Sequence, residues 1–368
     1  MSRVVVTGTG LVCSLGRERR AVLEALLAGK SGVREVGRPG IARAAPVADF
    51  DAAREAGPTK NLKYMSRASA LAVAAARLAV KDAALPDLGD ELGAYVGLGM
   101  TSSELGDLEK LVHVSKDENG KISSRLVGEK GLRATNPLIS FKILSNMPLC
   151  HVALATKARG PNVALHSVGG ETFSALAEAV SELREGRVKA ALFGAVDSQL
   201  ERAGAEQIGR SGVLAEGDGP GRVLGEGAAF CVLEREEDAR ARGARPLGVI
   251  ERVTFSLAPE AVTLEPANSL WLIHAMEQLG EGIEPAAVFS CAAGDEAGDK
   301  ADELLLRYRA PVTRTRLLLG ETLAAGPAID LVLAIAALEK NEGTSAPVLI
   351  VASSLSGTVS VALVGAPP

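Results

Sequence analysis

The segment from Gly160 to Asp197 constrains the fold of this chain more than any other. It begins Gly160-Pro-Asn-Val-Ala-Leu-His-Ser-Val-Gly-Gly-Glu-Thr-Phe173. Apolar residues, a pair of glycines and an alanine-rich amphipathic run follow one another there, which is typical of a strand, a tight turn and a helix. The predicted elements are a strand over 162–166, a turn at 169–170, a helix over 171–184 and a buried strand over 188–194.

A turn between a strand and a helix is a common place for a catalytic nucleophile. The first turn of the helix offers free backbone N–H groups, and the helix dipole favours an anion there. In this chain the apex residue is Gly169, which has no side chain. The sequence therefore predicts a turn shaped for a nucleophile but lacking one.

Strands and helices alternate along the rest of the chain, and several strands are apolar throughout. This pattern predicts an α/β fold in which helices cover a mostly parallel sheet. Two apolar helices, at 62–84 and 320–339, are expected to lie between sheets. Charged residues interrupt the apolar pattern near 235–245, so we expect two halves, 1–240 and 241–368.

Composition excludes several classes of function. Apolar residues make up 47% of the chain and charged residues 23%, the net charge is −5, and aromatic residues are only 3%. No long basic run or aromatic platform for nucleic acid is present, and no apolar run is long enough for a membrane span. The four cysteines are far apart and form no metal-binding pair. We therefore expect a cytoplasmic protein with no metal or other cofactor.

Several motifs occur in the order found in β-ketoacyl-ACP synthases, the ketosynthases of the thiolase superfamily, which this chain resembles over nearly its whole length. Each motif is weak alone, but their shared order is specific. The start, Val4-Val-Val-Thr-Gly-Thr-Gly-Leu-Val-Cys-Ser-Leu-Gly16, is also similar to theirs. The motifs are Gly160 to Asp197, Val223-Leu-Gly-Glu-Gly-Ala-Ala229, Ala297-Gly-Asp-Lys-Ala-Asp302, Gly320-Glu-Thr-Leu-Ala-Ala-Gly326 and Ser354-Leu-Ser-Gly-Thr358.

The resemblance implies a catalytic cysteine and two histidines, which carry the acyl chain and assist decarboxylation and condensation. Matched motif by motif, the cysteine position falls on Gly169 and the two histidine positions fall on Cys291 and Glu321. A lysine of the family falls on Arg316. Because each role needs a specific side chain, we expect no independent condensing activity.

The resemblance also implies an oxyanion hole and a pocket. The backbone N–H groups of Gly169 and Leu355 would form the oxyanion hole, although the family's Phe is replaced by Leu355. Lys300 matches a lysine of the family and is expected to pair with a nearby carboxylate. The remaining residues expected at the pocket are Arg316, Glu171, Ser354 and Ser356.

The remaining polar groups leave other chemistry open. Ser167 and His166 are adjacent in sequence, so in a strand they point to opposite faces and should not form a dyad. Cys291 and Glu321 are expected to face one another, and a neighbouring carboxylate would raise the pKa of the thiol. Cys291 is therefore expected to fill space, and Glu171 to cap its helix.

The resemblance implies a thiolase-like five-layer αβαβα fold and a dimer in which the strand at 162–166 pairs across the dimer axis. We predict an inactive homologue, similar to a chain-length factor, that pairs with an active ketosynthase, shapes its acyl pocket and works with an acyl carrier protein. Two alternatives remain. One is a diverged acyltransferase or thioester hydrolase that uses the oxyanion hole with Ser167, Cys291 or Glu321. The other is a homodimer that binds an acyl ligand without turnover.

Overall fold

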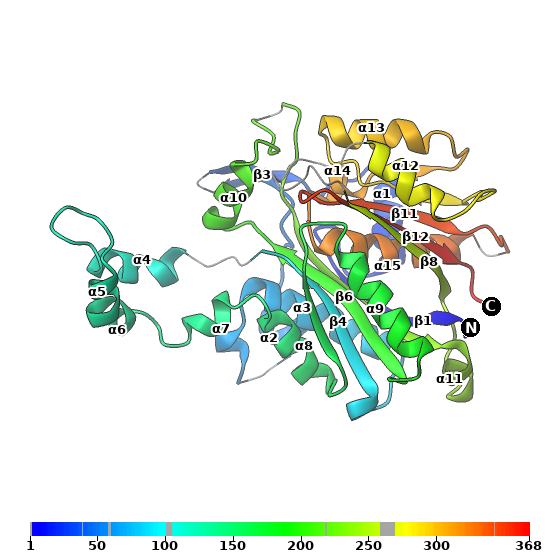
Figure 1. The fold of residues 1–368 in the computed structure, drawn as a ribbon, viewed down its shortest axis with the longest axis horizontal. Helices are drawn as coiled ribbons and strands as arrows, with labels where there is room; N and C mark the ends of the chain where they lie inside the picture. The colour runs from blue at the N-terminus through cyan, green and yellow to red at the C-terminus, as the bar shows by residue number, and fades with distance from the viewer. Residues whose placement is uncertain are drawn as a thin grey trace.

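A long β-sheet runs through the molecule and helices cover both of its faces (Figure 1). The computed structural model describes residues 2–38, 40–57, 60–100, 105–217, 219–257, 269–341 and 343–368. The strands are β1 (Val4–Val12), β2 (Arg34–Arg38), β3 (Ile41–Ala44), β4 (Leu92–Leu98), β5 (Asn162–His166), β6 (Ala190–Ser198), β7 (Glu226–Arg235), β8 (Gly248–Leu257), β9 (Ala287–Phe289), β10 (Val312–Thr313), β11 (Val348–Ser353) and β12 (Thr358–Gly365).

The helices vary from single turns to long buried segments. The short helical turns are η1 (Leu62–Tyr64), η2 (Gly89–Glu91) and the π-helical η3 (Val127–Gly131). The α-helices are α1 (Arg19–Leu27), α2 (Ala52–Glu55), α3 (Arg67–Asp82), α4 (Leu105–Val114), α5 (Ser124–Leu126), α6 (Leu132–Ala134), α7 (Ile139–Ile143), α8 (Met147–Thr156), α9 (Thr172–Arg184), α10 (Arg202–Gly209), α11 (Glu236–Ala241), α12 (Ser269–Glu277), α13 (Glu296–Leu305), α14 (Thr315–Leu319) and α15 (Ala325–Lys340).

The strand order repeats between the two ends of the sheet. Among the described residues the order is β10-β9-β11-β12-β8-β1-β7-β6-β4-β5, with β2 and β3 forming a separate hairpin. Numbered along the chain within each half, both β1, β4–β7 and β8–β12 have the spatial order 3-2-4-5-1. The parallel and antiparallel pairs also correspond. The prediction of a mostly parallel sheet is wrong, because five of the nine strand pairs in this sheet are antiparallel and four are parallel. The division between halves at 240 stays a prediction, and it falls between β7 and β8.

Five layers result from this repeat. β8 joins β1 through only three residue pairs, and the two halves of the sheet lie on either side of α9 and α15. Helix α15 contacts β7 in one half and β11 in the other, and α9 contacts strands of both halves. Helices α3 and α8 cover one outer face, while α12 and α13 cover the other. The predicted thiolase-like αβαβα fold is confirmed.

Helix α3 is the exception to the predicted layering, because it lies on an outer face rather than between sheets. Its small residues still serve close packing, here against β1. A Cβ at Gly10 would overlap the Ala75 carbonyl and lie 2.6 Å from the Ala79 nitrogen. The alanine-rich run was therefore correctly read as a tightly packed face, but helix α8 and not a second sheet covers its other side.

The helix predicted near the C-terminus also differs from the structure. The sequence predicts one helix over 320–339, but α14 ends at Leu319 and α15 begins at Ala325. Gly320 has a φ of +75°, which is incompatible with a continuous helix. Glu321 consequently lies in a loop between the two helices.

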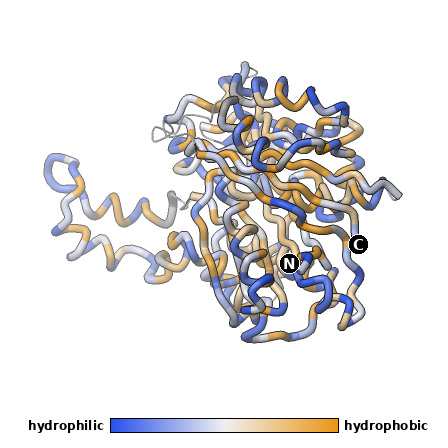
Figure 2. Tube along the Cα trace, turned by 45° about the vertical axis from the view of Figure 1, so that its right-hand side comes forward, coloured by the Kyte–Doolittle hydropathy of each residue, from blue (hydrophilic) through white to orange (hydrophobic). Residues whose placement is uncertain are grey.

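Helices α4 to α6 form an arm that extends away from the body of the molecule, and α7 lies against the body where the arm begins (Figure 1). Figure 2 shows hydrophobic residues along the strands of the body and mixed hydropathy along the arm. Across the ranges that the structure describes, no helix is both long and apolar enough to cross a bilayer.

Candidate functional site

Gly169 lies at the apex of the turn between β5 and α9, as predicted. Its φ is +148°, a conformation that favours glycine over residues with a side chain. A Cβ at this position would overlap the carbonyl oxygen of Ser353 and lie 2.8 Å from the Cα of Ser354. The turn has the strand–turn–helix geometry of a nucleophile elbow, but the backbone at the end of β11 fills the space that a side chain at its apex would need.

The N–H group of Gly169 already has an acceptor inside the chain. It donates to the Oγ of Ser167 over 3.1 Å, and the Oγ of Thr172 lies 2.9 Å from the same Ser167 oxygen. Leu355 is buried in an apolar cluster with Leu200, Leu224 and Leu323. The assignment of the Gly169 and Leu355 N–H groups to an oxyanion hole stays a prediction, with one donor internally satisfied.

Glu171 holds the loop between β11 and β12 against this turn. Its carboxylate accepts hydrogen bonds from the Ser354 hydroxyl (2.5 Å) and the Ser356 hydroxyl. The same carboxylate accepts the backbone N–H of Val168 at 3.2 Å. The structure thus brings Glu171, Ser354 and Ser356 together. The prediction that the Glu171 side chain caps α9 is wrong, since its carboxylate accepts no hydrogen bond from the first turn of that helix as the structure describes it. It instead links the start of α9 to a loop more than 180 residues away in sequence.

Replacing Glu171 with alanine is expected to lower the free energy of unfolding by about 1–3 kcal/mol, because two hydroxyl groups and one N–H would lose their acceptor. Hydrogen exchange in residues 353–357 should become faster. Denaturant titration and hydrogen-exchange mass spectrometry measure the two effects. Glu178→Ala, at an exposed position of the same helix, is the control. Equal stability and equal exchange in the two variants would show that Glu171 does not hold the loop.

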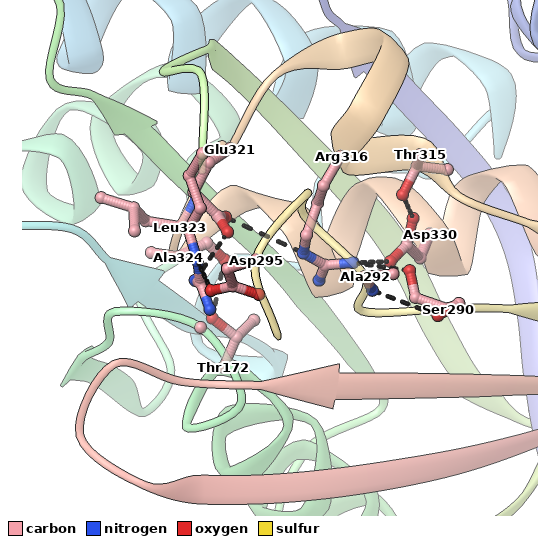
Figure 3. Close-up of polar contacts among 12 residues, drawn as sticks. Thr172, Ser290, Ala292, Asp295, Thr315, Arg316, Glu321, Leu323, Ala324 and Asp330 are labelled. Carbon is pink, nitrogen blue, oxygen red and sulfur yellow. Dashed lines mark hydrogen bonds and ion pairs between the residues drawn. The ribbon is translucent and has the colours of Figure 1, made fainter. Parts of the chain in front are cut away.

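A buried network of charges occupies the space beside the elbow (Figure 3). Arg222 donates from Nη1 to Glu321 Oε2 over 2.9 Å and from Nε to Asp295 Oδ2 over 2.7 Å. Arg316 donates from Nη1 to Asp330 Oδ2 over 3.1 Å, and its Nε lies 3.8 Å from Glu321 Oε1. Glu321 therefore bridges two arginines from different parts of the chain.

Burial makes the pairing in this network strong. Desolvation alone would lower the pKa of Arg222, but Glu321 and Asp295 outweigh it and the pKa is raised. Burial also raises the pKa of Asp330, although Arg316 opposes the shift. Removing one member would leave its partner charged and buried, which is far less favourable than losing a surface ion pair.

Cys291 and Glu321 are the residues expected at the two histidine positions, and no hydrogen bond joins their side chains among the described residues. Glu321 forms an ion pair with Arg222 at 2.9 Å, and Arg316 lies 3.8 Å from its other carboxylate oxygen. That Cys291 and Glu321 face one another stays a prediction. The pKa of the Cys291 thiol is raised, as expected, but the cause is burial, and Arg316 partly opposes it. A thiol with a raised pKa is a poor nucleophile.

The sequence reasoning missed three members of the network, Arg222, Asp295 and Asp330. One signal was available for Asp330, since a lone carboxylate inside an apolar helix needs a buried partner. Arg222 precedes a glycine-rich motif and gave no such signal. Its partner Glu321 is 99 residues away, so only the folded chain reveals the pair.

Three predicted site residues lie outside the buried charge network. Lys300 is on the exposed side of α13 and forms an ion pair with Glu296 at 2.7 Å, so it pairs with a carboxylate as expected but is outside the buried network. His166 is exposed and its Nε2 lies 2.8 Å from Ser145 Oγ. Ser167 is buried, so the two side chains form no dyad, as predicted from strand alternation.

Comparisons with known proteins agree with this geometry. The family model described as "Beta-ketoacyl synthase, N-terminal domain" matches residues 1–239. Nodulation protein E of Rhizobium meliloti (strain 1021) is 30% identical over 283 residues, which cover 69% of this chain and 63% of that protein. A 3-oxoacyl-[acyl-carrier-protein] synthase 2 of Vibrio cholerae serotype O1 is 26% identical over 91% of this chain and 86% of its own. The chain spans 60% of the corresponding Staphylococcus aureus (strain COL) protein.

Solved structures show the same fold. The ishigamide ketosynthase/chain length factor has a TM-score of 0.81 at 24% identity, and the alignment covers 100% of both chains. A type II polyketide synthase acyl-carrier protein in complex with its ketosynthase has a TM-score of 0.76 at 18% identity, again over 100% of both chains. The family match covers well over half of the chain, and the elbow and the five-layer fold are consistent with it. The chain therefore belongs to the β-ketoacyl synthase family.

Proposed function

We propose that this chain is a non-condensing ketosynthase homologue that pairs with an active ketosynthase and shapes the pocket for the growing acyl chain. One observation carries the proposal. The apex of the elbow is Gly169, and the carbonyl oxygen of Ser353 fills the place of its side chain. A covalent acyl intermediate needs a nucleophile at that place, and the fold leaves no room for one.

The two other catalytic positions support the proposal. Neither Cys291 nor Glu321 can supply the imidazole that a ketosynthase uses. The raised pKa of the Cys291 thiol disfavours the thiolate at neutral pH. Glu321 is held in ion pairs with Arg222 and Arg316, so its carboxylate is occupied.

An edge strand supports pairing with another subunit. β5 is the last strand of the sheet, and its residues alternate between exposed and half-buried. Unpaired strand edges are sites where a second chain can add. We propose that β5 pairs with the equivalent strand of an active ketosynthase, and that an acyl carrier protein supplies the partner's active site. The names of two structural neighbours, a ketosynthase/chain length factor and a ketosynthase–carrier complex, fit this assembly.

Co-expression with an active ketosynthase tests the proposal. We expect the two proteins to co-purify at about equal stoichiometry, and the length distribution of the acyl products to change when this chain is present. Ala164→Arg, which places a charge on the exposed side of β5, should abolish both effects. Lys81→Glu, at an exposed position of α3, is the control and should abolish neither. A protein that remains a homodimer and leaves product length unchanged would refute the proposal.

Assays on the purified protein test the two alternatives, a diverged acyltransferase or hydrolase and an acyl-binding homodimer. The protein alone is incubated with acyl carrier protein thioesters and acyl-CoA. Turnover that disappears in Cys291→Ala or Glu321→Ala would establish a diverged acyltransferase or hydrolase. Stoichiometric binding by a homodimer without turnover would establish an acyl-binding protein. We expect neither, because the Gly169 N–H is bound to Ser167 and the Cys291 thiol is buried.

A further inference from the structure

The arm formed by α4 to α6 is an ordered helical hairpin. At its tip the N–H of Ser123 donates to the carbonyl oxygen of Ser115 over 2.9 Å. The Asp117 carboxylate accepts the N–H groups of Asn119 and Lys121, each over 2.9 Å. Helix α5, the π-helical η3 and α6 then follow one another without a break. These hydrogen bonds fix the turn between α4 and the second helical stretch, so the arm has a defined shape.

The two helical stretches of the arm pack on each other rather than on the body. A Cβ at Gly131 would lie 2.5 Å from Ser115 Oγ and 3.3 Å from Leu111 Cγ, so the lack of a side chain at Gly131 allows the close approach. The principal contacts of α4, α5, η3 and α6 are with one another, and Figure 1 shows the hairpin projecting from the rest of the molecule. The body of this chain therefore gives the arm little support.

The arm has no apolar core of its own. Among the residues of 108–146 whose burial is described, only Ser115, Gly131 and Thr135 are buried. The larger apolar side chains there are half-buried or exposed, and Ile122 and Leu132 are 61% and 63% exposed. Helices as short as these are marginal in water unless an apolar face packs against something else. A surface outside this chain is therefore needed to stabilise the arm.

The base of the arm adjoins the edge strand β5. His166, the last residue of β5, has its Nε2 2.8 Å from the Oγ of Ser145, which lies between α7 and α8. Helix α8 contacts β5. The apolar side chains of Leu144, before α8, and Leu154, on α8, are 52% and 62% exposed. A subunit that pairs with β5 would consequently lie next to the base of the arm and to further exposed apolar residues.

Strand pairing at β5 is too small to hold two subunits together. The strand has five residues, and a pair of such strands buries only a fraction of the about 1,200–2,000 Å² that a stable interface needs. A subunit added at β5 must therefore contact other surfaces of this chain. The arm and α8 are the surfaces next to β5 that expose large apolar side chains.

We propose that the arm lies across the surface of the ketosynthase subunit that pairs with β5, and that this subunit buries Ile122 and Leu132. The inference rests on the proposed function, because the occupant is the ketosynthase of that assembly. Exposed cations accompany both anchors, since Lys121 precedes Ile122 and Arg133 follows Leu132. Interfaces commonly combine an apolar centre with a polar rim. The arm therefore fits an apolar surface of the ketosynthase that is bordered by carboxylates.

Hydrogen-exchange mass spectrometry of the full chain, alone and in complex with an active ketosynthase, tests the placement of the arm. In the chain alone, amides of 108–135 should exchange quickly, because no apolar core protects the two helical stretches. In the complex the same peptides should exchange several-fold more slowly. Peptides from α13, on an outer face of the C-terminal half, should exchange equally in both samples.

Substitutions at the two anchors test the same contact by affinity. Ile122→Asp and Leu132→Asp should each raise the dissociation constant for immobilised ketosynthase about tenfold or more, because a charge would have to be buried in an apolar surface. Both positions are exposed in the chain alone, so the variants should fold normally. Leu306→Asp is the control. Leu306 follows α13 and is 68% exposed, and its replacement should leave the dissociation constant unchanged.

The possible outcomes separate this inference from the proposed function. If the complex forms but exchange in 108–135 is unchanged and both anchor variants bind like the wild type, the arm contact is refuted and the proposed function remains. If no complex with an active ketosynthase forms, both are refuted. If the arm becomes protected in the protein alone as its concentration rises, the occupant is a second copy of this chain, and the choice of the ketosynthase is wrong.

Discussion

Gly169→Cys is expected to destabilise the protein by about 3 kcal/mol and to leave it without condensing activity. The substituted residue would occupy the position of a ketosynthase nucleophile, but its Cβ would overlap the Ser353 carbonyl and approach Ser354 Cα to 2.8 Å. A φ of +148° is also unfavourable for any residue with a side chain. Guanidinium titration measures the stability, and a carrier-protein condensation assay measures the activity.

The control for Gly169→Cys is a substitution at a glycine where an added Cβ would meet no other atom. A Cβ at Gly128, inside η3, meets no atom within 4 Å, so Gly128→Ala should leave the free energy of unfolding unchanged or raise it by up to about 1 kcal/mol. Gly169→Ala should resemble Gly169→Cys in stability, because the conflict begins at Cβ. A Gly169→Cys protein as stable as the wild type would mean that the loop at 353–354 yields easily, and any condensation by it would remove the main support for the proposed function.

Arg222→Ala is expected to lower the free energy of unfolding by about 3–5 kcal/mol. The Arg222 side chain is 3% exposed and pairs with Asp295 and Glu321, and its removal would leave both carboxylates buried without this partner. The pair connects the segment before β7 to two segments of the C-terminal half, so the loss should affect the packing of one half on the other. Denaturant titration followed by circular dichroism measures the change.

Two comparisons isolate the buried charge. Arg202→Ala breaks a pair with Glu206 in which both side chains are more than half exposed, and it should change stability by less than about 0.5 kcal/mol. The double variant Arg222→Met, Glu321→Met should lose less stability than the sum of its single variants, because each single change leaves a buried charge. Additive losses would show that the two side chains act separately.

The structure of the elbow could be predicted from local sequence patterns. The strand, glycine turn and helix around Gly169 follow from a few adjacent residues, and the structure places each of them within one or two residues of the prediction. The absence of a nucleophile is a statement about residue identity, which needs no coordinates. Strand alternation also separated Ser167 from His166 correctly.

The sequence did not predict the layer in which α3 lies or the break between α14 and α15. Periodicity identified α3 as a tightly packed helix, but it does not say whether a sheet or another helix covers the second face, and here α8 does. The loop at 320–324 is apolar enough to continue α15, and its separation depends on Gly320 in a left-handed conformation. Both outcomes depend on contacts between distant segments.

The sequence alone determined the fold class, the order of the motifs and the residues expected at the three catalytic positions, because each of these depends on residue type and local spacing. Tertiary structure decided what fills the vacant positions. The Ser353 carbonyl oxygen occupies the space beside Gly169, and Arg222 and Arg316 lie within ion-pair distance of the Glu321 carboxylate. The contact of Ser353 with Gly169 and the pair of Arg222 with Glu321 join residues about 180 and 100 positions apart, and no local pattern in the sequence encodes either of them.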